Sequence, residues 1–315
     1  MLKAGLFILP VLIIYGIRKY IESKWSNCKN KIKLDGKLII ITGANSGIGF
    51  EVAKDLAARN ANIILACRNI NAAEEAIQNI KEKVSHAGTL IPMELDLASL
   101  ESVKNFAEKF KRNHKELHVL INNAGVSYPK SERKVTKDCL EIHFGVNHLG
   151  HFYLTNLLLD LLEKSKPSKV VFVSSKLHEK GKLNTEDLNS EWSMEKVNLY
   201  SNSKLANAYT VKELALRTKN KGIDVFAVCP GWIYTNLFRH SIKWYHYILV
   251  SPIAFFFMRS AKQGAQTIIY CATEPGLESG MIYRDCKMYE SSHPFDPKVS
   301  TELWSKSEEI IKQKI

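Results

Sequence analysis

The chain has 315 residues, of which 45% are hydrophobic, and a formal net charge of +12 at pH 7. This length and hydrophobic content allow one large α/β domain with a packed core. The six cysteines form no CxxC pair, and the ten histidines show neither zinc-ligand spacing nor an HExxH motif, so we expect reduced core thiols and no metal site.

The N-terminal part differs in composition from the rest of the chain. Residues 4–17 are apolar apart from Tyr15. Between Lys3 and Lys37, eight basic residues against two acidic ones give a net charge of +6, half of the total. Basic residues beside an apolar stretch are typical of a membrane flank and argue against a nucleic-acid partner.

Three interpretations of this segment compete, because the apolar run is shorter than the roughly 20 residues that span a bilayer. They are a short signal anchor, a cleaved signal peptide and an amphipathic helix on the membrane surface. No small-x-small cleavage site follows the apolar core, and most of the basic residues come after it. Both observations favour an N-terminal membrane anchor with a basic flank at residues 1–35, and the remaining chain in the cytosol.

A single catalytic domain is expected over residues 36–315. It opens with a β-branched run at 38–41, and a helical pattern follows at 50–59. Between them, the sequence TGANSGIG at 42–49 permits a tight turn and close approach of the backbone to a pyrophosphate at a helix N-terminus. This turn predicts a dinucleotide site formed by Gly43, Asn45, Ser46, Gly47, Ile48 and Gly49.

The second expected strand, at 62–67, ends at Arg68. An acidic residue at this position would bind the ribose hydroxyls of NAD, whereas an arginine can pair with the 2′-phosphate of NADP. Arg68 therefore predicts NADP(H), in practice NADPH, as the cofactor. Further strands at 90–97 and 117–121 alternate with helices, which predicts an α/β fold with a Rossmann-type, doubly wound parallel sheet.

Tyr200 and Lys204 are four residues apart, so on one helix they would lie on the same face. A neighbouring ammonium favours the phenolate, and Lys204 is therefore expected to lower the pKa of Tyr200. Such a tyrosine can exchange a proton with an alcohol or carbonyl oxygen. His143, His148 and His151 follow one another at helical spacing, and we interpret them as packing residues without an acidic partner nearby in the sequence.

Taken together, these motifs strongly resemble the short-chain dehydrogenase/reductase family from about residue 36 to residue 290. The resemblance rests on the turn at 42–49, Asp96-Leu97, Asn122-Asn123-Ala124-Gly125 and Tyr200-x-x-x-Lys204. The finer pattern is most similar to the retinol dehydrogenases of the membrane-anchored, NADP-preferring branch, on the stretches 66–68, 146–152, 203–207 and 264–267. It implies an alcohol dehydrogenase or carbonyl reductase.

The resemblance also implies a role for each matching residue. Asn147 would hold a water in a proton relay, and Ser175, with Ser174 as the neighbouring candidate, would hydrogen-bond the substrate oxygen. Tyr200 would transfer the proton, and Lys204 would bind the nicotinamide ribose. The remaining cofactor contacts would come from Asp96, Leu97, Asn122, Ala124, Gly125, Pro230, Gly231 and Thr235.

The stretch that follows Gly231 is rich in bulky apolar side chains, and the resemblance makes it a substrate lid at about 232–262. An apolar lid suits a lipophilic substrate that partitions into a membrane. The leading hypothesis is an NADPH-dependent reductase of retinal or similar aldehydes, anchored in the endoplasmic reticulum. The alternatives are a hydroxysteroid or other lipid carbonyl reductase, and a non-catalytic NADP-binding scaffold. Homodimers are common in the family, and the oligomeric state stays open.

Overall fold

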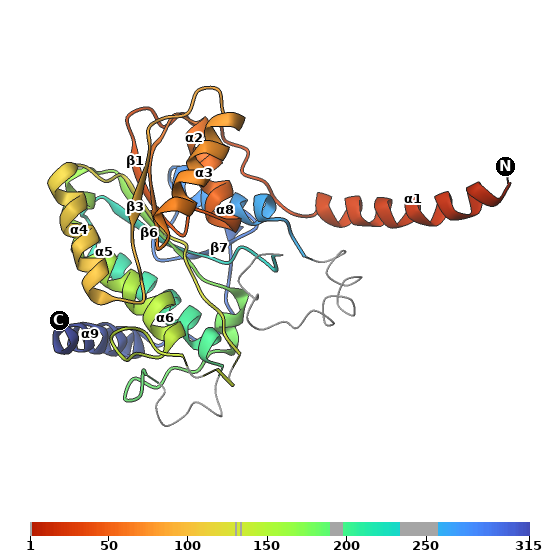
Figure 1. Ribbon diagram of the computed structural model, residues 1–315. Coiled ribbons are helices and arrows are strands. Elements are labelled where there is room, and N and C mark those ends of the chain that lie inside the picture. Colours follow the sequence, from red (N-terminus) through yellow and green to blue (C-terminus); the bar gives the residue numbers. More distant parts are fainter. Residues whose placement is uncertain (1, 130, 133, 190–197, 234–257) are drawn as a thin grey trace.

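The computed structural model describes residues 2–129, 131–132, 134–189, 198–233 and 258–315 (Figure 1). In this part of the chain the strands form one sheet in the order β3-β2-β1-β4-β5-β6-β7-β8, parallel except for the last pair. The predicted parallel sheet is therefore confirmed. The strands are β1 Leu38–Thr42, β2 Asn62–Cys67, β3 Leu90–Glu94, β4 Val119–Asn122, β5 Ser168–Val173, β6 Ile223–Val228, β7 Ile282–Arg284 and β8 Lys287–Met288.

Helices cover both faces of this sheet (Figure 1). Ile40 of β1 joins the core on one face, whereas Ile39 and Ile41 join the core on the other, as the alternation of a strand requires. All three are fully buried, and each contributes about 1.5–3 kcal/mol to folding. The first core packs against α4 Leu100–Asn113, α5 Gly150–Lys164, α6 Leu199–Arg217 and α9 Pro297–Lys314, and the second against α2 Gly47–Ala58, α3 Ile70–Lys83 and α8 Ala261–Thr273.

Short polar side chains determine where several helices begin. The side chains of Asn69, Ser99, Asn198 and Ser260 each accept a hydrogen bond from the backbone N–H three residues further on. Strand β3 ends at Glu94, earlier than the predicted 97, because the Asp96 carboxylate accepts the N–H of Ala98 and turns the chain toward α4. The other strands predicted in this half begin and end within two residues of their observed bounds.

The strand order places the site. β1 lies between β2 and β4, so the chain runs outward on one side of β1 and returns on the other. The loops after β1 and β4 then flank a crevice at the carboxyl edge of the sheet, where doubly wound sheets bind ligands. The glycine-rich turn at 42–49 and the segment at 122–125 are these two loops.

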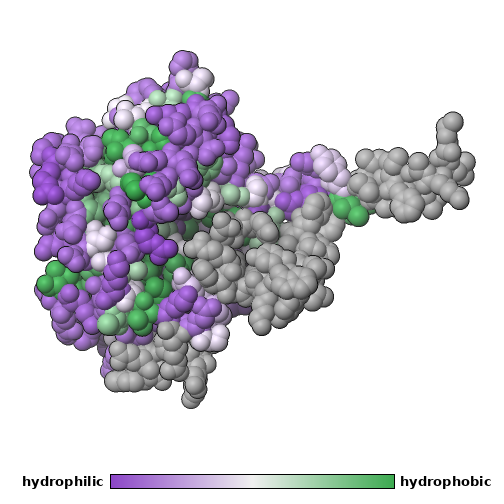
Figure 2. Space-filling view, viewed as in Figure 1, coloured by the Kyte–Doolittle hydropathy of each residue, from purple (hydrophilic) through white to green (hydrophobic). Residues whose placement is uncertain are grey.

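The N-terminal helix α1, Leu2–Ser23, projects from the body (Figure 1). Large apolar side chains are exposed along its described half, namely Ile13, Ile14, Tyr15, Ile17 and Tyr20. By contrast, Figure 2 shows a mostly hydrophilic surface on this side of the body, with smaller hydrophobic patches between the polar groups. Among the described residues, no helix is both long and apolar enough to cross a membrane. The membrane anchor therefore stays a prediction.

Candidate active site

The cofactor turn joins β1 to α2. Gly43 and Gly47 have φ angles of +65° and +57°, which glycine adopts without steric penalty. A Cβ at Gly49 would lie 2.3 Å from the Gly43 carbonyl oxygen, so the packing of the turn requires glycine there. The N–H groups of the first turn of α2 have no intrahelical partners, and their partial positive charge favours a phosphate. The predicted residues Asn45, Ser46 and Ile48 belong to the same turn.

Thr42 connects this turn to the loop after β4. Its hydroxyl oxygen accepts the N–H groups of Asn123 and Ala124, both at 2.9 Å. Asn122, the last residue of β4, donates from Nδ2 to the Thr155 hydroxyl on α5 at 2.9 Å, which links the central strand to that helix. Its Oδ1 is buried and has no hydrogen-bond partner among the described residues. The two loops therefore form one rigid unit.

Arg68 is exposed directly after β2. The thiol of the preceding residue, Cys67, lies near the backbone of Ala44 and Asn45, which partly offsets the rise of its pKa through burial. Arg68 consequently lies beside the cofactor turn, as its predicted contact with a nucleotide phosphate requires.

Asp96 and Leu97 follow β3 on the same edge of the sheet. The Asp96 carboxylate accepts the Ala98 N–H at 3.1 Å and forms an ion pair with Lys137 at 3.2 Å. Leu97 is buried, and its carbonyl oxygen would be 2.8 Å from a Cβ at Gly150, the first residue of α5. Both residues are tied to their own loops, and their contact with the cofactor stays a prediction.

Tyr200 and Lys204 lie on one face of α6, as predicted. The helix begins at Asn198, whose Oδ1 accepts the Ser201 N–H at 3.0 Å. Lys204 Nζ lies 5.8 Å from the centroid of the Tyr200 ring. The Lys204 side chain is buried, and Nζ donates a hydrogen bond to the Val173 carbonyl at the end of β5 (2.8 Å). The two groups therefore meet at the carboxyl edge of the sheet.

The expected pKa of Tyr200 is wrong in its direction. Burial raises the pKa of the phenol above its ordinary value, and a hydrogen bond with Ser175 lowers it only in part. Burial also lowers the pKa of Lys204 from 10.5 to about 8, because it disfavours the ammonium. Lys204 is directed to the Val173 carbonyl, so its charge does not outweigh the desolvation of Tyr200. At neutral pH this tyrosine is a proton donor.

The structure distinguishes Ser175 from Ser174. Ser174 is buried, and its hydroxyl donates to the Lys204 carbonyl oxygen at 2.8 Å. Ser175 begins the short 3₁₀ helix η2 Lys176–Lys180, and its hydroxyl lies near enough to the Tyr200 phenol to lower the pKa of that group. Of the two serines, only Ser175 has its hydroxyl beside the phenol, which favours it as the predicted partner of a substrate oxygen.

Asn147 lies in a π-helical turn, η1 Phe144–Leu149, a geometry that frequently marks functional sites. Its Nδ2 donates to the Val126 carbonyl and to the Ser203 hydroxyl, both at 3.0 Å, and its Oδ1 accepts the Val126 N–H at 2.8 Å. A Cβ at Gly125 would lie 3.3 Å from this Oδ1 and 3.6 Å from Lys204 Nζ. Gly125 thus lets Asn147 and Lys204 face a common space.

A buried, hydrogen-bonded histidine and glutamate lie beside Tyr200 and were not predicted from the sequence. His143 Nδ1 lies 2.6 Å from Glu141 Oε1, and both side chains are almost fully buried. The His143 ring packs edge-on against Tyr200, with 6.3 Å between centroids. The expectation that His143 has no acidic neighbour is therefore wrong, and the sequence E-x-H at 141–143 was the signal for it.

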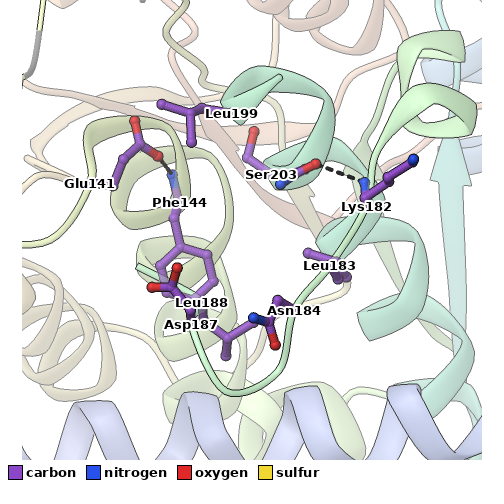
Figure 3. Close-up of a pocket in the computed structure, with 10 residues that line it drawn as sticks. Glu141, Phe144, Lys182, Leu183, Asn184, Asp187, Leu188, Leu199 and Ser203 are labelled. Atoms are coloured by element: carbon purple, nitrogen blue, oxygen red, sulfur yellow. Dashed lines mark hydrogen bonds between the residues drawn. The ribbon is translucent and has the colours of Figure 1, made fainter. Parts of the chain in front are cut away.

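A pocket of about 140 Å³ lies between η1, the start of α6 and the loop at 182–188. Figure 3 shows residues that line it. Glu141, Phe144 and Ser203 line it, and Glu141 accepts the Phe144 N–H at 2.8 Å. Neither Tyr200 nor Lys204 lines this pocket, so it is not the catalytic crevice.

The cofactor loop after β6 is described as far as Ile233. Pro230 is buried, and Gly231 has a φ of +95°. A Cβ at Gly231 would lie 2.9 Å from Nε of Arg259, which pairs with Asp285 at 2.6 Å. Thr235 and most of the expected lid at 232–262 lie outside the described residues.

The chain belongs to the short-chain dehydrogenase family, whose model matches residues 37–246. The site and the fold thus define an oxidoreductase of the alcohol dehydrogenase type, with a fold that binds NAD or NADP. More particularly, the chain is similar to retinol dehydrogenases: it is 40% identical to human retinol dehydrogenase 12 over 98% of this chain and 96% of the relative. It is 43% identical to mouse retinol dehydrogenase 14 over 88% and 86%, respectively. The predicted family and the predicted similarity to retinol dehydrogenases are confirmed.

Solved structures share the fold. An uncharacterized protein from Mycobacterium paratuberculosis is 31% identical, with a TM-score of 0.71 over 92% of this chain and 98% of that one. A 7α-hydroxysteroid dehydrogenase complexed with NADH is 24% identical, with a TM-score of 0.64 over 80% of this chain and 93% of that one. At that identity the second likeness concerns the fold alone.

Proposed function

We propose that this protein is an NADP(H)-dependent oxidoreductase that interconverts retinal and retinol, or similar lipophilic aldehydes and alcohols, with reduction as the favoured direction. The observation that carries the proposal is the meeting of Tyr200, Lys204, Ser175 and Asn147 beside the cofactor turn. The similarity to retinol dehydrogenases over nearly the whole chain supports the retinoid substrate. All four catalytic side chains are present, which argues against a non-catalytic scaffold.

The residues of this chain supply the proton and the positioning. When bound, NADPH supplies the hydride for a carbonyl carbon, and negative charge then grows on the carbonyl oxygen. Tyr200 donates its proton to that oxygen, and Ser175 donates a second hydrogen bond, which stabilises charge present only in the transition state. Lys204, mostly protonated below its pKa of about 8, would hold the ribose of the cofactor and would stabilise the phenolate that forms. Asn147 holds the water that returns a proton.

The preference for NADP(H) rests on Arg68. Its side chain is exposed beside the cofactor turn, and β2 ends in Cys67 without a carboxylate to bind the ribose hydroxyls. A guanidinium at this position can form a bidentate pair with a 2′-phosphate. Arg68→Asp is expected to change the cofactor preference from NADP(H) to NAD(H). A carboxylate at this position repels the 2′-phosphate and accepts hydrogen bonds from the ribose hydroxyls.

The N-terminal segment attaches the enzyme to a membrane, with the catalytic domain on the cytosolic side of the endoplasmic reticulum. Exposed apolar side chains on α1 and the basic residues that follow it support this attachment. The end of α1 also touches one end of the expected lid: Arg18 donates to the Met258 carbonyl at 3.0 Å. The guanidinium groups of Arg18 and Arg259 both contact the Trp25 ring, at 4.7 and 5.2 Å from its centroid. A lipophilic substrate could then pass from the bilayer to the site.

The experiment follows NADPH oxidation by vesicle-bound protein with all-trans-retinal, beside NADH and a Tyr200→Phe variant. We expect NADPH-dependent turnover that Tyr200→Phe abolishes. If a steroid ketone turns over and retinal does not, the proposed retinoid substrate is wrong. A preference for NADH would contradict the role assigned to Arg68. NADPH binding without turnover of any carbonyl would favour the scaffold.

A further inference from the structure

The turn that carries Ser175 is closed by His178. The backbone N–H of His178 donates to the Ser175 carbonyl oxygen at 2.9 Å, and the Nδ1 of the same residue lies 2.6 Å from that oxygen. A carbonyl oxygen only accepts, so Nδ1 carries a hydrogen, and His178 occupies both lone pairs of this carbonyl. The main chain and the side chain of one residue therefore fix the turn together.

The same turn determines the direction of the Ser175 hydroxyl. The N–H of Leu177, one residue before His178, donates to Ser175 Oγ at 3.2 Å. The oxygen is thus an acceptor within its own turn, and its hydrogen is left for another acceptor. The hydroxyl also lies beside the Tyr200 phenol. A closed turn therefore directs the O–H of Ser175 to the oxygen that would receive the proton of Tyr200.

The opposite nitrogen of His178 binds a distant segment, residues 289–295 between β8 and α9, which we call the C-terminal clamp. Ser291 Oγ lies 2.7 Å from His178 Nε2. The ring is fully buried, and burial lowers its pKa below the ordinary 6.5, so the ring is neutral at neutral pH. Because Nδ1 carries the single ring hydrogen, Nε2 accepts the hydroxyl hydrogen of Ser291. The hydrogen bonds thus have a defined direction from the clamp to the Ser175 carbonyl.

Further contacts hold the C-terminal clamp on η2. Glu179 Oε1 accepts the Tyr289 O–H at 2.6 Å and the Ser292 N–H at 3.1 Å. The Phe295 ring stacks with that of His178, with 6.2 Å between the centroids. The family model matches residues 37–246, so the clamp lies beyond the part of the chain that this model matches. A segment outside the matched region therefore packs directly on the helix that begins at the catalytic serine.

We propose that His178 is a positioning residue of the active site: through its ring, the C-terminal clamp keeps the Ser175 turn closed and the Ser175 hydroxyl directed at the substrate oxygen. The His178 side chain is fully buried, and both of its ring nitrogens are occupied, so it neither binds the substrate nor transfers a proton. This inference rests on the proposed function, because it specifies how Ser175 is held for that reaction.

Three substitutions separate the hydrogen bonds of His178. The amide of asparagine can reach the position of Nδ1, so His178→Asn keeps the donor to the Ser175 carbonyl. The longer glutamine reaches the position of Nε2, so His178→Gln keeps the contact with Ser291 and loses that donor. Ser291→Ala leaves the ring in place and removes only the bond from the clamp. The matched control is Ser300→Ala, because the buried Ser300 hydroxyl of α9 donates to the Tyr209 carbonyl at 3.0 Å, away from the Ser175 turn.

We expect His178→Gln to lower kcat about tenfold to a hundredfold, the range for a catalytic group displaced by up to an ångström. The KM for retinal and the Kd for NADPH should stay within about twofold, because the bond from Ser175 strengthens only as charge develops in the transition state. His178→Asn should recover most of kcat, Ser291→Ala should lose part of it, and Ser300→Ala should keep it. Equal kcat in His178→Gln and Ser300→Ala, corrected for folded protein, would overturn the proposal.

A double-mutant cycle shows whether His178 acts through Ser175. Ser175→Ala should itself lower kcat about a hundredfold, as the loss of one donor to a developing oxyanion does. In that background His178→Gln should change kcat by less than about twofold, since the hydroxyl that it positions is absent. An equal loss in both backgrounds would show a purely structural role and overturn the proposal. An unchanged kcat in Ser175→Ala would instead refute the catalytic assignment of Ser175, which belongs to the proposed function.

The ¹⁵N spectrum of histidine-labelled protein tests the network without turnover. The signal of His178, identified by its loss in His178→Gln, should be that of a neutral, Nδ1-protonated ring at pH 7. Ser291→Ala should shift its Nε2 resonance, because that nitrogen loses its donor. An Nε2-protonated ring, or an Nε2 resonance unchanged in Ser291→Ala, would contradict the network.

Discussion

We expect Lys204 to lower the free energy of unfolding of the protein, although the proposed reaction requires this residue. Its side chain is buried, and burial lowers its pKa from 10.5 to about 8. At pH 7 folding must therefore desolvate an ammonium, and a difference of this size corresponds to roughly 3 kcal/mol. Lys204→Met removes that cost. It also removes the 2.8 Å hydrogen bond to the Val173 carbonyl, worth about 1 kcal/mol. We expect Lys204→Met to be inactive and more stable by roughly 2 kcal/mol at pH 7.

The dependence on pH tests the cause of this gain. The folded-state pKa lies below the unfolded one, so between about pH 8 and 10.5 the unfolded chain binds the proton more tightly. The penalty in the native protein is full below pH 8 and disappears as the pH rises to 10.5. The advantage of Lys204→Met should therefore shrink over this interval.

Urea unfolding followed by tryptophan fluorescence at several pH values measures the difference. Lys169 is the control, because its pKa is also lowered by burial and its Nζ donates to the Glu274 carbonyl at 2.5 Å. Like Lys204→Met, Lys169→Met should be more stable than the native protein at pH 7, but it should keep its activity. A Lys204→Met protein less stable than the native one at pH 7, or a gain that does not change between pH 8 and 10.5, would refute this account.

Four other predictions concern glycine conformation, packing and thiol reactivity. Gly49→Ala should weaken NADPH binding about tenfold in a fluorescence titration, since its Cβ would lie 2.3 Å from a carbonyl oxygen. Gly276→Ala, with a φ of +70° and open space, should cost about 1 kcal/mol of stability and leave binding unchanged. Trp25→Ala removes contacts with two guanidinium groups, worth about 0.5–1 kcal/mol each, and should lower the thermal midpoint; an unchanged midpoint would contradict the packing. In a thiol titration of the folded protein, the exposed Cys139 should react, whereas Cys229, whose pKa burial raises to about 12, should react only after unfolding.

The fold and the cofactor turn could be predicted because they depend on local pattern. In the run at 38–41, residues 39–41 are fully buried on both faces of the sheet, and no polar residue interrupts the run. The glycines at 43 and 47 have the left-handed conformations that a tight turn requires. Spacing also placed Tyr200 and Lys204 on one helical face. Each of these features is determined by residues close together in the sequence.

The pKa of Tyr200 could not be predicted in this way. The attraction between a phenolate and an ammonium follows from spacing, but desolvation depends on how the whole chain buries the phenol. Burial outweighs the charge of Lys204, which is directed to a carbonyl from β5. The contact of Trp25 with Arg259 is also invisible in the sequence, since 234 positions separate the two residues.

Hydrogen bonds between different segments of the chain hold the polar groups of the site. These bonds make the site rigid, while the burial of the polar groups lowers the stability of the fold. Lys204 Nζ binds the carbonyl of Val173, while the next hydroxyl, that of Ser174, binds the carbonyl of Lys204. The end of β5 and the start of α6 thus fix each other in both directions. Asn147 is fixed in the same manner, through its side chain to Val126 and through its carbonyl to α5 and α6. A substitution that breaks one such bond frees a buried polar group as well as a catalytic one, so stability and rate should fall together. Lys204→Met is the informative exception, because there the freed carbonyl costs less than the charge that is removed.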